Sequence, residues 1–566
     1  MKTLNLHCDY LKFKSQKKAI KTIDEMAPDQ IHEGESKDCL AVLTAVESHD
    51  THEGISKFVE SIKELAEKLQ TNNIVLYPYA HLSSNLASPE SAIGILDKIA
   101  EKLKGFNILK APFGYYKSLE LKVKGHPMSE LSREFKIESN EEAEDISEKQ
   151  RNKLLRQISK AKLDTSKLKD NDHRIIGGKM DLWSFNNVAP GMVFWHPKGL
   201  HIKNKLIEFW RELHRTDGYE EISTPQIMDR KLWEVSGHWS KYGENNFKTQ
   251  YEKRDFIVKP MNCPGGMLVY KTSPKTYKDL PLRTGEIGII HRIELSGTLG
   301  GLFRLIQFTQ DDAHIFCTKK QLESEVIRVI DLINKTFNQF GLEFDHVELS
   351  TRPEKRIGSE EVWDLAETSL ENILKKSKMK YSVNKGDGAF YGPKIDFHLK
   401  DSLGRTWQCS TIQLDMALPE RFDLNYQNEK NENIRPIMLH RVVYGAIERF
   451  IGIITEHFNG KFPLWLSPNQ IKVMTLNDDA KEYAQKIYQN LFDTGYQVEL
   501  NDKSESMGKK AREASIQRFN YILTVGENEM KENKVAIKAR DSKEIITMSL
   551  EEFKQKVNSE INQKQL

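Results

Sequence analysis

Cysteine is scarce in this chain, because only five cysteines are scattered over 566 residues and none forms a CxxC pair. Such scatter gives no sign of a disulfide framework and fits a reducing compartment. Long apolar runs are also missing, since no stretch approaches the ~18–20 uninterrupted apolar residues of a membrane span. The first residues lead directly into a strand-like segment, without the apolar stretch of a signal peptide. We therefore expect a cytoplasmic protein without a membrane segment.

An excess of either charge is absent as well. The chain has 84 basic and 82 acidic side chains, which leaves a net charge of +2. A balanced total neither requires nor excludes a nucleic-acid partner, because local patches decide such binding. Internal repeats of the periods that mark solenoids are also missing. With 38% hydrophobic residues, the composition is that of a globular protein with about three or four domains.

Residues 1–145 have the pattern of a small α/β domain. The expected strands are residues 4–11, 40–46 and 74–80, and residues 55–70 have the pattern of an amphipathic helix. Side chains able to position water or stabilise an oxyanion follow some of these elements, namely His81, Tyr116, Lys117 and Glu130. Each of them alone is more often a surface or capping residue, so the pattern by itself indicates a small α/β domain and no more.

Two further regions carry clustered basic residues. Residues 146–185 read as a charged helical linker, in which eight basic side chains between Lys149 and Lys169 follow an acidic stretch at 139–145. Such a run is usually a solvated helix or linker, which we favour, although it can also contact the phosphates of a nucleic acid. Residues 466–566 read as a small mixed α/β domain with a basic helix at 506–518.

Residues 186–465 form the largest region, and we expect a mostly antiparallel sheet with helices on one side. The expected strands are residues 218–225, 287–294, 302–316, a pair within 390–415 broken at 401–404, and 434–440. The expected helices are residues 200–213 and 443–458. In the second helix, Gly445, Arg449 and Gly452 would share a face, where glycine costs ~1 kcal/mol relative to alanine but lets a bulky group approach the guanidinium.

The strand expected at 302–316 has an unusual polar face. Because side chains alternate along a strand, one face would carry Arg304, Gln310, Asp312 and His314, and in the preceding strand Arg292 would share a face with Glu294. If such a face is buried, each polar group must be satisfied, or the fold loses several kcal/mol. The alternative is an edge strand whose polar face is in water.

Several motifs in residues 176–566 resemble class II aminoacyl-tRNA synthetases, and specifically the threonyl-tRNA synthetase family. They are Val235-Ser-Gly-His-Trp239, Met261-Asn-Cys-Pro-Gly-Gly266, His291-Arg-Ile-Glu-Leu-Ser-Gly297, Phe308-Thr-Gln-Asp-Asp-Ala-His314, Tyr391-Gly-Pro-Lys394 and Glu448-Arg-Phe-Ile-Gly452. Residues 1–145 resemble the editing domain of archaeal members, which is related to D-tyrosyl-tRNA deacylase, through Tyr77-Pro-Tyr-Ala-His-Leu-Ser-Ser84 and Gly125-His-Pro-Met-Ser-Glu-Leu-Ser132. Residues 466–566 resemble the anticodon-binding domain.

The resemblance implies a threonine–tRNA ligase that uses ATP with Mg²⁺. Activation joins a carboxylate to the α-phosphorus of ATP, so negative charge must be neutralised and both reactants held in line. By resemblance, Arg292 bridges the substrate carboxylate and the α-phosphate, and Arg449 binds the nucleotide phosphates. The planar guanidinium suits both tasks. The other ATP-side positions would be Glu294, Arg304, Phe308, which would stack on adenine, and Gln408.

The resemblance also implies a zinc ion bound by Cys263, His314 and His440, with an open position for substrate. Zinc would bind the amino group and the hydroxyl of threonine together, so valine, which lacks the hydroxyl, would be rejected. Asp312 would accept a hydrogen bond from that hydroxyl. The rest of the threonine site would be formed by Met261, Gln310 on the carboxylate, Tyr391 and Gln413.

Serine differs from threonine by one methyl group, which is worth only ~1–3 kcal/mol of discrimination. A second, hydrolytic sieve is therefore needed. By resemblance the N-terminal domain hydrolyses seryl-tRNA(Thr), with His81, Tyr116, Lys117 and Glu130 at its site. Whether a side chain or a hydroxyl of the tRNA itself activates water stays open.

Some positions depart from the family pattern. Near the expected ATP site, Ala446 occupies the place of a small hydroxyl residue, and Ile306 occupies a place where an arginine is common. In the expected anticodon-binding domain, Glu529 matches a base-reading position, but Lys538 occupies a place where arginine is usual. A homodimer through residues 218–225 and a tRNA(Thr) partner are expected. The rival hypotheses are an RNA-binding regulator without ligase activity and a synthetase for serine or proline.

Overall fold

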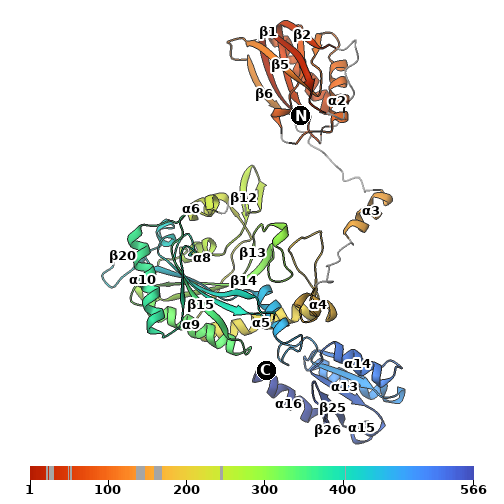
Figure 1. The fold of residues 1–566 in the computed structure, drawn as a ribbon, viewed down its shortest axis with the longest axis vertical. Coiled ribbons are helices and arrows are strands. Elements are labelled where there is room, and N and C mark those ends of the chain that lie inside the picture. The colour runs from red at the N-terminus through yellow and green to blue at the C-terminus, as the bar shows by residue number, and fades with distance from the viewer. Residues whose placement is uncertain are drawn as a thin grey trace. The chain divides into compact units, whose positions relative to one another are not determined.

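The computed structural model describes residues 1–20, 23, 31–48, 50, 54–83, 85–135, 147–158, 168–241, 246–401 and 403–566. The chain divides into two compact units, Met1–Ser147 and Glu148–Leu566, which Figure 1 shows from the red N-terminus to the blue C-terminus. The acidic stretch 139–145 and Lys160, Lys162 and Lys167 of the predicted linker lie outside the described residues.

The first unit is built on a six-stranded sheet with the order β4-β3-β2-β1-β5, and β6 also pairs with β1. The strands are β1 (Lys2–Lys18), β2 (Glu33–Ala45), β3 (Asn73–Pro78), β4 (Asn107–Lys110), β5 (Tyr115–Val123) and β6 (Glu130–Glu134). Its helices α1 (Gly54–Lys68) and α2 (Pro89–Lys102) pack their apolar residues against the sheet. In α1 those residues recur every three or four positions, and Ile55, Phe58 and Ile62 are fully buried.

The second unit contains an eight-stranded sheet with the order β16-β15-β17-β18-β21-β14-β13-β9. All neighbours are antiparallel except the two edge pairs, so the predicted antiparallel sheet is confirmed. The strands are β9 (Glu220–Glu221), β13 (Leu282–His291), β14 (Gln307–Cys317), β15 (Phe344–Ser350), β16 (Ser382–Asn384), β17 (Lys394–Lys400), β18 (Thr406–Asp415) and β21 (Ile437–Ala446).

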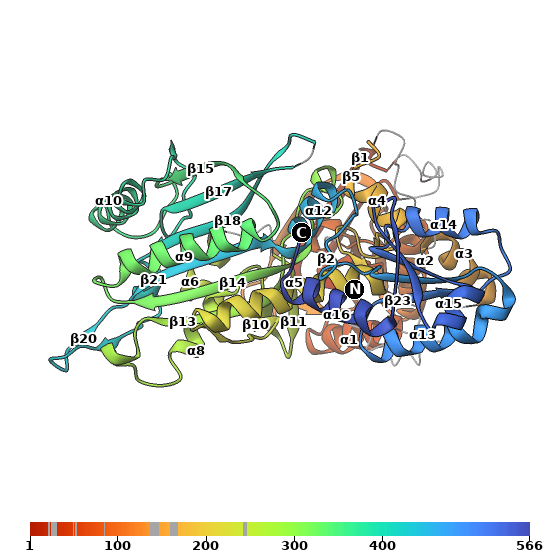
Figure 2. The same cartoon turned by 90° about the horizontal axis from the view of Figure 1, so that it is seen from below.

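Helices of the second unit bury their apolar faces against this sheet. The long ones are α5 (Pro197–Thr216), α9 (Leu322–Asn338), α10 (Glu360–Lys376) and α12 (Ile447–His457). Figure 2 shows α9 running along the sheet, and one continuous core joins the helices to it. The short helices α8 (Cys263–Tyr270) and α11 (Leu418–Arg421) contribute to a second, smaller hydrophobic cluster. The short helix α6 (Arg230–Ser236) contributes to a third. The small sheet of β10 (Ile227–Asp229), β11 (Lys248–Tyr251) and β12 (Arg254–Val258) lies beside α6.

The strand boundaries around the predicted polar face differ from expectation. β13 ends at His291 and β14 begins at Gln307. Arg292, Glu294 and Arg304 therefore lie on the connection between the strands, so the prediction that they share strand faces was wrong. The apolar run before Phe308 packs into the core as a loop instead, with Leu302 and Phe303 buried.

The boundary between the last strand and its helix was also misplaced. β21 continues to Ala446, and α12 begins at Ile447. Gly445 therefore belongs to the strand, with a φ of +79° that favours glycine, and a Cβ there would lie 2.5 Å from the carbonyl oxygen of Cys409. In α12, a Cβ on Gly452 would lie 3.1 Å from Phe303. Both glycines allow close packing within the protein, and Gly445 also lines the cavity described below.

The C-terminal part is a five-stranded mixed sheet with the order β23-β22-β24-β25-β26. Its elements are β22 (Ile471–Thr475), α13 (Lys481–Asp493), β23 (Val498–Asn501), α14 (Met507–Ile516), β24 (Tyr521–Val525), α15 (Glu527–Glu532), β25 (Val535–Ala539), β26 (Ile545–Met548) and α16 (Leu550–Asn562). The sequence analysis missed β26 and α16. It also overestimated the strand at 218–225, of which only β9 forms.

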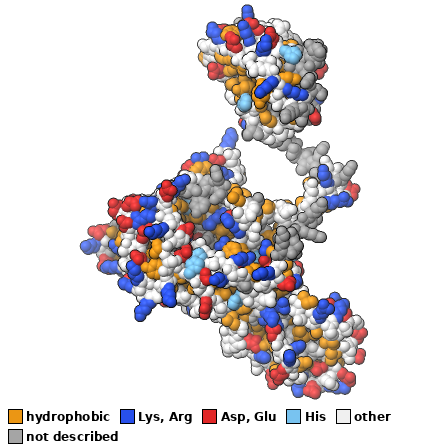
Figure 3. Space-filling view, in the orientation of Figure 1, with side chains coloured by type: hydrophobic (Ala, Val, Ile, Leu, Met, Phe, Trp, Pro, Cys, Tyr) orange, Lys and Arg blue, Asp and Glu red, His pale blue; other side chains and the backbone are white. Residues whose placement is uncertain are grey.

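The linker contains two short helices among its described residues, α3 (Glu148–Ile158) and α4 (His173–Lys179). On the visible surface, basic and acidic side chains are interspersed (Figure 3), in keeping with the small net charge. Among the described helices, none has the length and apolar character needed to cross a bilayer.

Candidate functional site

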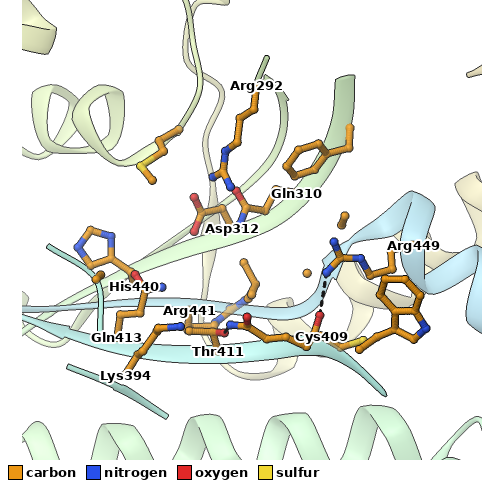
Figure 4. Close-up of a pocket in the computed structure, with 18 of the residues that line it drawn as sticks. Arg292, Gln310, Asp312, Lys394, Cys409, Thr411, Gln413, His440, Arg441 and Arg449 are labelled. Carbon is orange, nitrogen blue, oxygen red and sulfur yellow. Dashed lines mark hydrogen bonds between the residues drawn. The ribbon is translucent and has the colours of Figure 1, made fainter. Parts of the chain in front are cut away.

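A cavity of about 550 Å³ opens on the face of the eight-stranded sheet that carries Gln310 and Asp312. It is lined by all the residues expected at the ATP, threonine and zinc positions except His314, namely Met261, Cys263, Arg292, Glu294, Arg304, Phe308, Gln310, Asp312, Tyr391, Gln408, Gln413, His440 and Arg449. Figure 4 shows Arg292 close to Gln310 and Asp312, and Thr411 and Gln413 on β18, which β21 separates from β14 in the same sheet. Segments far apart in the sequence thus meet in one polar cavity.

Two arginines are held in this cavity by backbone carbonyls. Arg292 Nε donates to the carbonyl of Pro260 at 3.1 Å, and its guanidinium lies 5.5 Å from the ring centre of Phe308. Arg449 Nε donates to the carbonyl of Phe303 at 2.9 Å and Nη1 to that of Gln408 at 3.0 Å (Figure 4). Burial lowers the pKa of Arg449. Neither arginine has a carboxylate within these contacts, so both fit an anionic ligand.

Arg304 is placed differently from these two arginines. Its guanidinium pairs with Glu294 at 2.9 Å, and about half of the side chain is exposed. Both residues lie in the connection between β13 and β14 and line the cavity.

A buried carboxylate organises the floor of the cavity. Asp396 is 1% exposed and accepts hydrogen bonds from Gln408 Nε2 at 2.6 Å and Thr411 Oγ1 at 2.7 Å. Its other oxygen accepts from Ser350 at 2.9 Å and pairs with Lys394 Nζ at 2.8 Å. Although burial alone would lower the pKa of Lys394, Asp396 and Asp387 raise it. Lys394, which closes the motif beginning at Tyr391, was not singled out from the sequence.

Asp312 has a buried amide partner. Asn262 Nδ2 donates to Asp312 Oδ2 at 3.2 Å, and Asn262 itself is fully buried. A Cβ on Gly288 of β13 would lie 2.2 Å from Asn262 Oδ1, so this glycine makes room for the amide. Asn262 stands between Met261 and Cys263, but nothing in its position marked it as a partner of Asp312.

Cys263, His314 and His440 converge at the end of the cavity next to Asp312. One potential ligand atom from each lies within 4.8 Å of the others, and all three residues are buried. The rings of His314 and His440 are 5.0 Å apart at 87°. His440 Nε2 lies 2.8 Å from Asp415 Oδ2, so Nδ1 keeps its lone pair.

The chemistry of this trio fits a zinc ion. Within the described part of the chain, neither ring nitrogen of His314 has a hydrogen-bond partner, although both are buried. A metal bond would satisfy one of them. Burial lowers the pKa of His314 to about 4, which keeps the imidazole neutral for ligation. Burial also raises the pKa of Cys263 well above its ordinary value, so a thiolate here requires a cation beside it. One sulfur and two nitrogens are a donor set typical of zinc.

A second cavity of about 480 Å³ lies in the first unit. His81, Tyr116 and Lys117 line it, together with the aromatic residues Tyr77, Tyr79, Phe113 and Tyr115. Lys117 Nζ donates to the carbonyls of Pro112 at 2.8 Å and Tyr115 at 3.1 Å. Burial lowers the pKa of Lys117 to about 8.

The other predicted positions are distributed as follows. Glu130 is exposed on β6, opposite Leu6 of β1, and does not line the second cavity. Ala446 lines the first cavity, whereas Ile306 packs beneath Gly191 and does not. In the C-terminal domain Glu529 accepts from Gly526 N at 2.9 Å, and Lys538 is exposed on β25.

Three family models match the chain in separate segments. Residues 246–458 match the tRNA synthetase class II core domain (G, H, P, S and T), and residues 470–560 match an anticodon binding domain. Residues 1–135 match the archaea-specific editing domain of threonyl-tRNA synthetase. The fold around the first cavity is therefore that of a class II aminoacyl-tRNA synthetase, as predicted.

Comparison with individual proteins narrows the class. The chain is 52% identical over 394 residues to a threonine–tRNA ligase of Clostridium tetani. The matched region covers 70% of this chain and 62% of the relative. Identity to the ligase of Desulforamulus reducens is 50% over 426 residues, or 73% and 67% of the two chains. A structure titled as the RNA binding domain of threonyl-tRNA synthetase from Cryptosporidium parvum matches with a TM-score of 0.67 at 40% identity, over 69% of this chain and 98% of that one. The chain belongs to the threonyl-tRNA synthetase family. It spans less than two thirds of the length of the Clostridium tetani relative.

Proposed function

We propose that the protein is a threonine–tRNA ligase that activates L-threonine with ATP, transfers it to tRNA(Thr), and hydrolyses mischarged seryl-tRNA(Thr). The observation that carries the proposal is one cavity that brings Arg292 and Arg449 together with Asp312, with the ligand trio Cys263, His314 and His440 at its end. A protein that only binds RNA has no use for two arginines free to bind anions beside a metal site.

The two arginines supply the charge neutralisation that adenylate formation needs. Arg292 neutralises the substrate carboxylate and the α-phosphate, while Arg449 binds the phosphates of an ATP that carries Mg²⁺. Their backbone contacts fix both guanidinium groups before substrate arrives, so little reorganisation is needed during the reaction. Phe308 offers its ring to adenine, and Gln408, Glu294 and Arg304 complete the nucleotide end.

Asp312 and the ligand trio select the amino acid. Cys263, His314 and His440 would hold a zinc ion, which would supply a Lewis acid for the amino and hydroxyl groups of threonine. Asp312, held by Asn262 at 3.2 Å, accepts from the same hydroxyl. Valine leaves these groups unpaired and is excluded strongly, as is typical of sites built to bind a hydroxyl. Met261, Gln310, Tyr391 and Gln413 enclose the side chain and the carboxylate.

Serine retains the hydroxyl, so recognition of the hydroxyl does not exclude it, and the resulting seryl-tRNA(Thr) must be hydrolysed after transfer. We place that hydrolysis in the second cavity, with His81, Tyr116 and Lys117 beside the ester. Glu130 is left out because it lies away from this cavity.

The remaining partners follow from the same function. The C-terminal domain contacts the anticodon through the surface near Glu529 and Lys538, and the exposed basic side chains of α3 are available to tRNA phosphates. A homodimer through the region around β9 and a cytoplasmic location complete the proposal.

Amino-acid-dependent exchange of pyrophosphate into ATP tests the activation step in the purified protein. Threonine should drive the exchange, serine weakly, and valine and proline not at all. Exchange driven by proline, or by serine in preference to threonine, would assign the chain to another substrate. Absence of exchange with every amino acid would favour the RNA-binding regulator.

A further inference from the structure

A buried histidine outside the cavity joins three elements of the second unit. His173, on α4, is 1% exposed. Its Nδ1 lies 2.8 Å from Glu456 Oε1 of α12, and its Nε2 accepts a hydrogen bond from the backbone N–H of Leu302 at 3.0 Å. Because Nε2 is the acceptor, Nδ1 carries the proton and donates to the carboxylate. One ring thus ties the connection between β13 and β14 to α12.

The surrounding residues leave space for this ring and for little else. Gly301 has a φ of +55°, and a Cβ there would lie 2.3 Å from His173 Nε2. The ring of Phe303 meets His173 edge-on at 4.3 Å and stacks on Trp407 at 4.5 Å. The backbone at residues 301–303 is therefore shaped around the imidazole.

The same short segment holds the arginine of the nucleotide end. The carbonyl of Phe303, one residue after the N–H bound by His173, accepts from Arg449 Nε at 2.9 Å. Arg405 also connects Glu456 with Phe303, because its Nη2 donates to Glu456 at 3.0 Å and its guanidinium lies 4.7 Å from the Phe303 ring. A displacement of Leu302 and Phe303 would therefore move the acceptor that orients Arg449.

We propose that His173 is a positioning residue for the ATP end of the cavity, acting through the backbone of Leu302 and Phe303 on Arg449. The proposal rests on the proposed function, since it assumes that Arg449 binds the nucleotide. The bond to Leu302 N carries the effect on ATP, whereas the bond to Glu456 fastens α4 to α12. These two bonds can be separated by substitution.

Two matched substitutions test the proposal in the full chain. His173→Asn places an amide near Nδ1, which keeps the donor to Glu456 and loses the acceptor for Leu302 N. His173→Gln places an amide oxygen near Nε2 and keeps that acceptor instead. In threonine-dependent pyrophosphate exchange, His173→Asn should lower kcat/KM for ATP on the order of tenfold, the effect of one buried hydrogen bond. The KM for threonine should change less than about twofold, and His173→Gln should recover most of the loss.

Asp172→Ala serves as the control for the integrity of α4. The Asp172 side chain accepts from Arg174 N at 2.9 Å at the start of the helix. Its Oδ1 lies 3.5 Å from His173 Nδ1, whereas Leu302 N binds Nε2 of the same ring. This variant should lower the unfolding temperature without the selective loss for ATP. Equal losses in His173→Asn and His173→Gln, a parallel rise in the KM for threonine, or a selective ATP loss in Asp172→Ala would each overturn the proposal.

Calorimetric titration with ATP separates this proposal from the proposed function. The affinity for ATP should fall in His173→Asn and return in His173→Gln, whichever amino acid the protein activates. If wild type binds ATP but exchanges nothing with threonine, the proposed function fails while the role of His173 is still measured. If ATP affinity is the same in wild type and both variants, the positioning role is wrong.

Discussion

Buried polar residues behind the cavity hold the groups that face it. Asp396 holds Gln408 and Lys394, Asn262 holds Asp312, and Asp415 holds His440. The sequence could suggest the facing residues, because they occur in recognisable motifs. It could not suggest their partners, because a hydrogen bond between positions 262 and 312 depends on how two distant segments pack. Unpaired, each partner would cost about 1–3 kcal/mol, so these contacts also stabilise the fold.

Asp312→Asn tests how the hydroxyl of threonine is recognised. The amide keeps the size of the side chain but loses the charge, so kcat/KM for threonine should fall about 10–100-fold, the effect of one hydrogen bond to a charged group. Asp387→Asn is the matched control. Asp387 lines the same cavity, but its side chain is largely exposed and pairs with Lys394 at 3.1 Å. Steady-state exchange kinetics would contradict the assignment if the control lost as much activity as Asp312→Asn.

Lys117 is expected to titrate in the experimentally accessible range. Its folded-state pKa of about 8 lies below the ordinary value of 10.5, so the unfolded chain binds more protons between these two values. Its contribution to stability should therefore rise with pH from about 8 to 10.5 and be least favourable below pH 8. Competitive amine labelling followed across pH should give a midpoint near 8 at Lys117. A midpoint above 10 would show that the amine is not desolvated in this cavity.

Elements with a clear period were the most predictable. Alternation correctly placed Gln310 and Asp312 on one face of β14, where both line the cavity, because side-chain direction in a strand follows sequence position. Arg304, predicted on the same face, lies before the strand begins. The ends of β13 and β14 were misjudged because apolar residues continue into the connecting loop, where Leu302 and Phe303 are buried without strand geometry. Gly445 appeared helical by spacing, although it lies within β21 with a positive φ.

The close approach of β13 to Asn262 at Gly288 can be tested by substitution. Gly288→Ala would press a Cβ against the Asn262 amide and displace the partner of Asp312. We expect a destabilisation of about 1–3 kcal/mol, typical of overpacking, and weaker threonine activation. Gly297→Ala, in the connection after the same strand, has nothing within 4 Å of the new Cβ and should change little. Thermal unfolding of both variants checks this, and equal stability would contradict the packing argument.

At the scale of the whole molecule, composition indicated several domains, and the motifs indicated their kinds. Each unit has its own hydrophobic core. β26 was not predicted because the exposed strand Ile545–Met548 lacks a buried face with clear alternation. α16 was overlooked, although Ser549 and Glu552 form a capping box and Phe553 and Val557 lie one turn apart on its buried face. The sequence also could not show that Glu130 lies outside the second cavity, since a motif does not tell where its side chain points in the fold.

Deletion of residues 1–147 tests the division of labour between the units. The remaining chain keeps the first cavity and its core, so threonine charging of tRNA(Thr) should persist. Seryl-tRNA(Thr) should then accumulate, because hydrolysis is lost while serine activation continues. Charging assays with labelled serine measure this, with Lys117→Met in the full chain as the matched variant of the second cavity. Unchanged hydrolysis of seryl-tRNA(Thr) after deletion would move editing to another part of the chain.

The central claim is that a metal held by Cys263, His314 and His440 selects threonine. The most direct measurement is threonine-dependent pyrophosphate exchange in protein stripped of zinc by a chelator, with metal content determined on the same sample. Exchange should fall with zinc content and return when about one equivalent of zinc is restored, whereas His314→Ala should neither bind that equivalent nor recover. Full exchange with threonine in protein that contains no measurable zinc would contradict it.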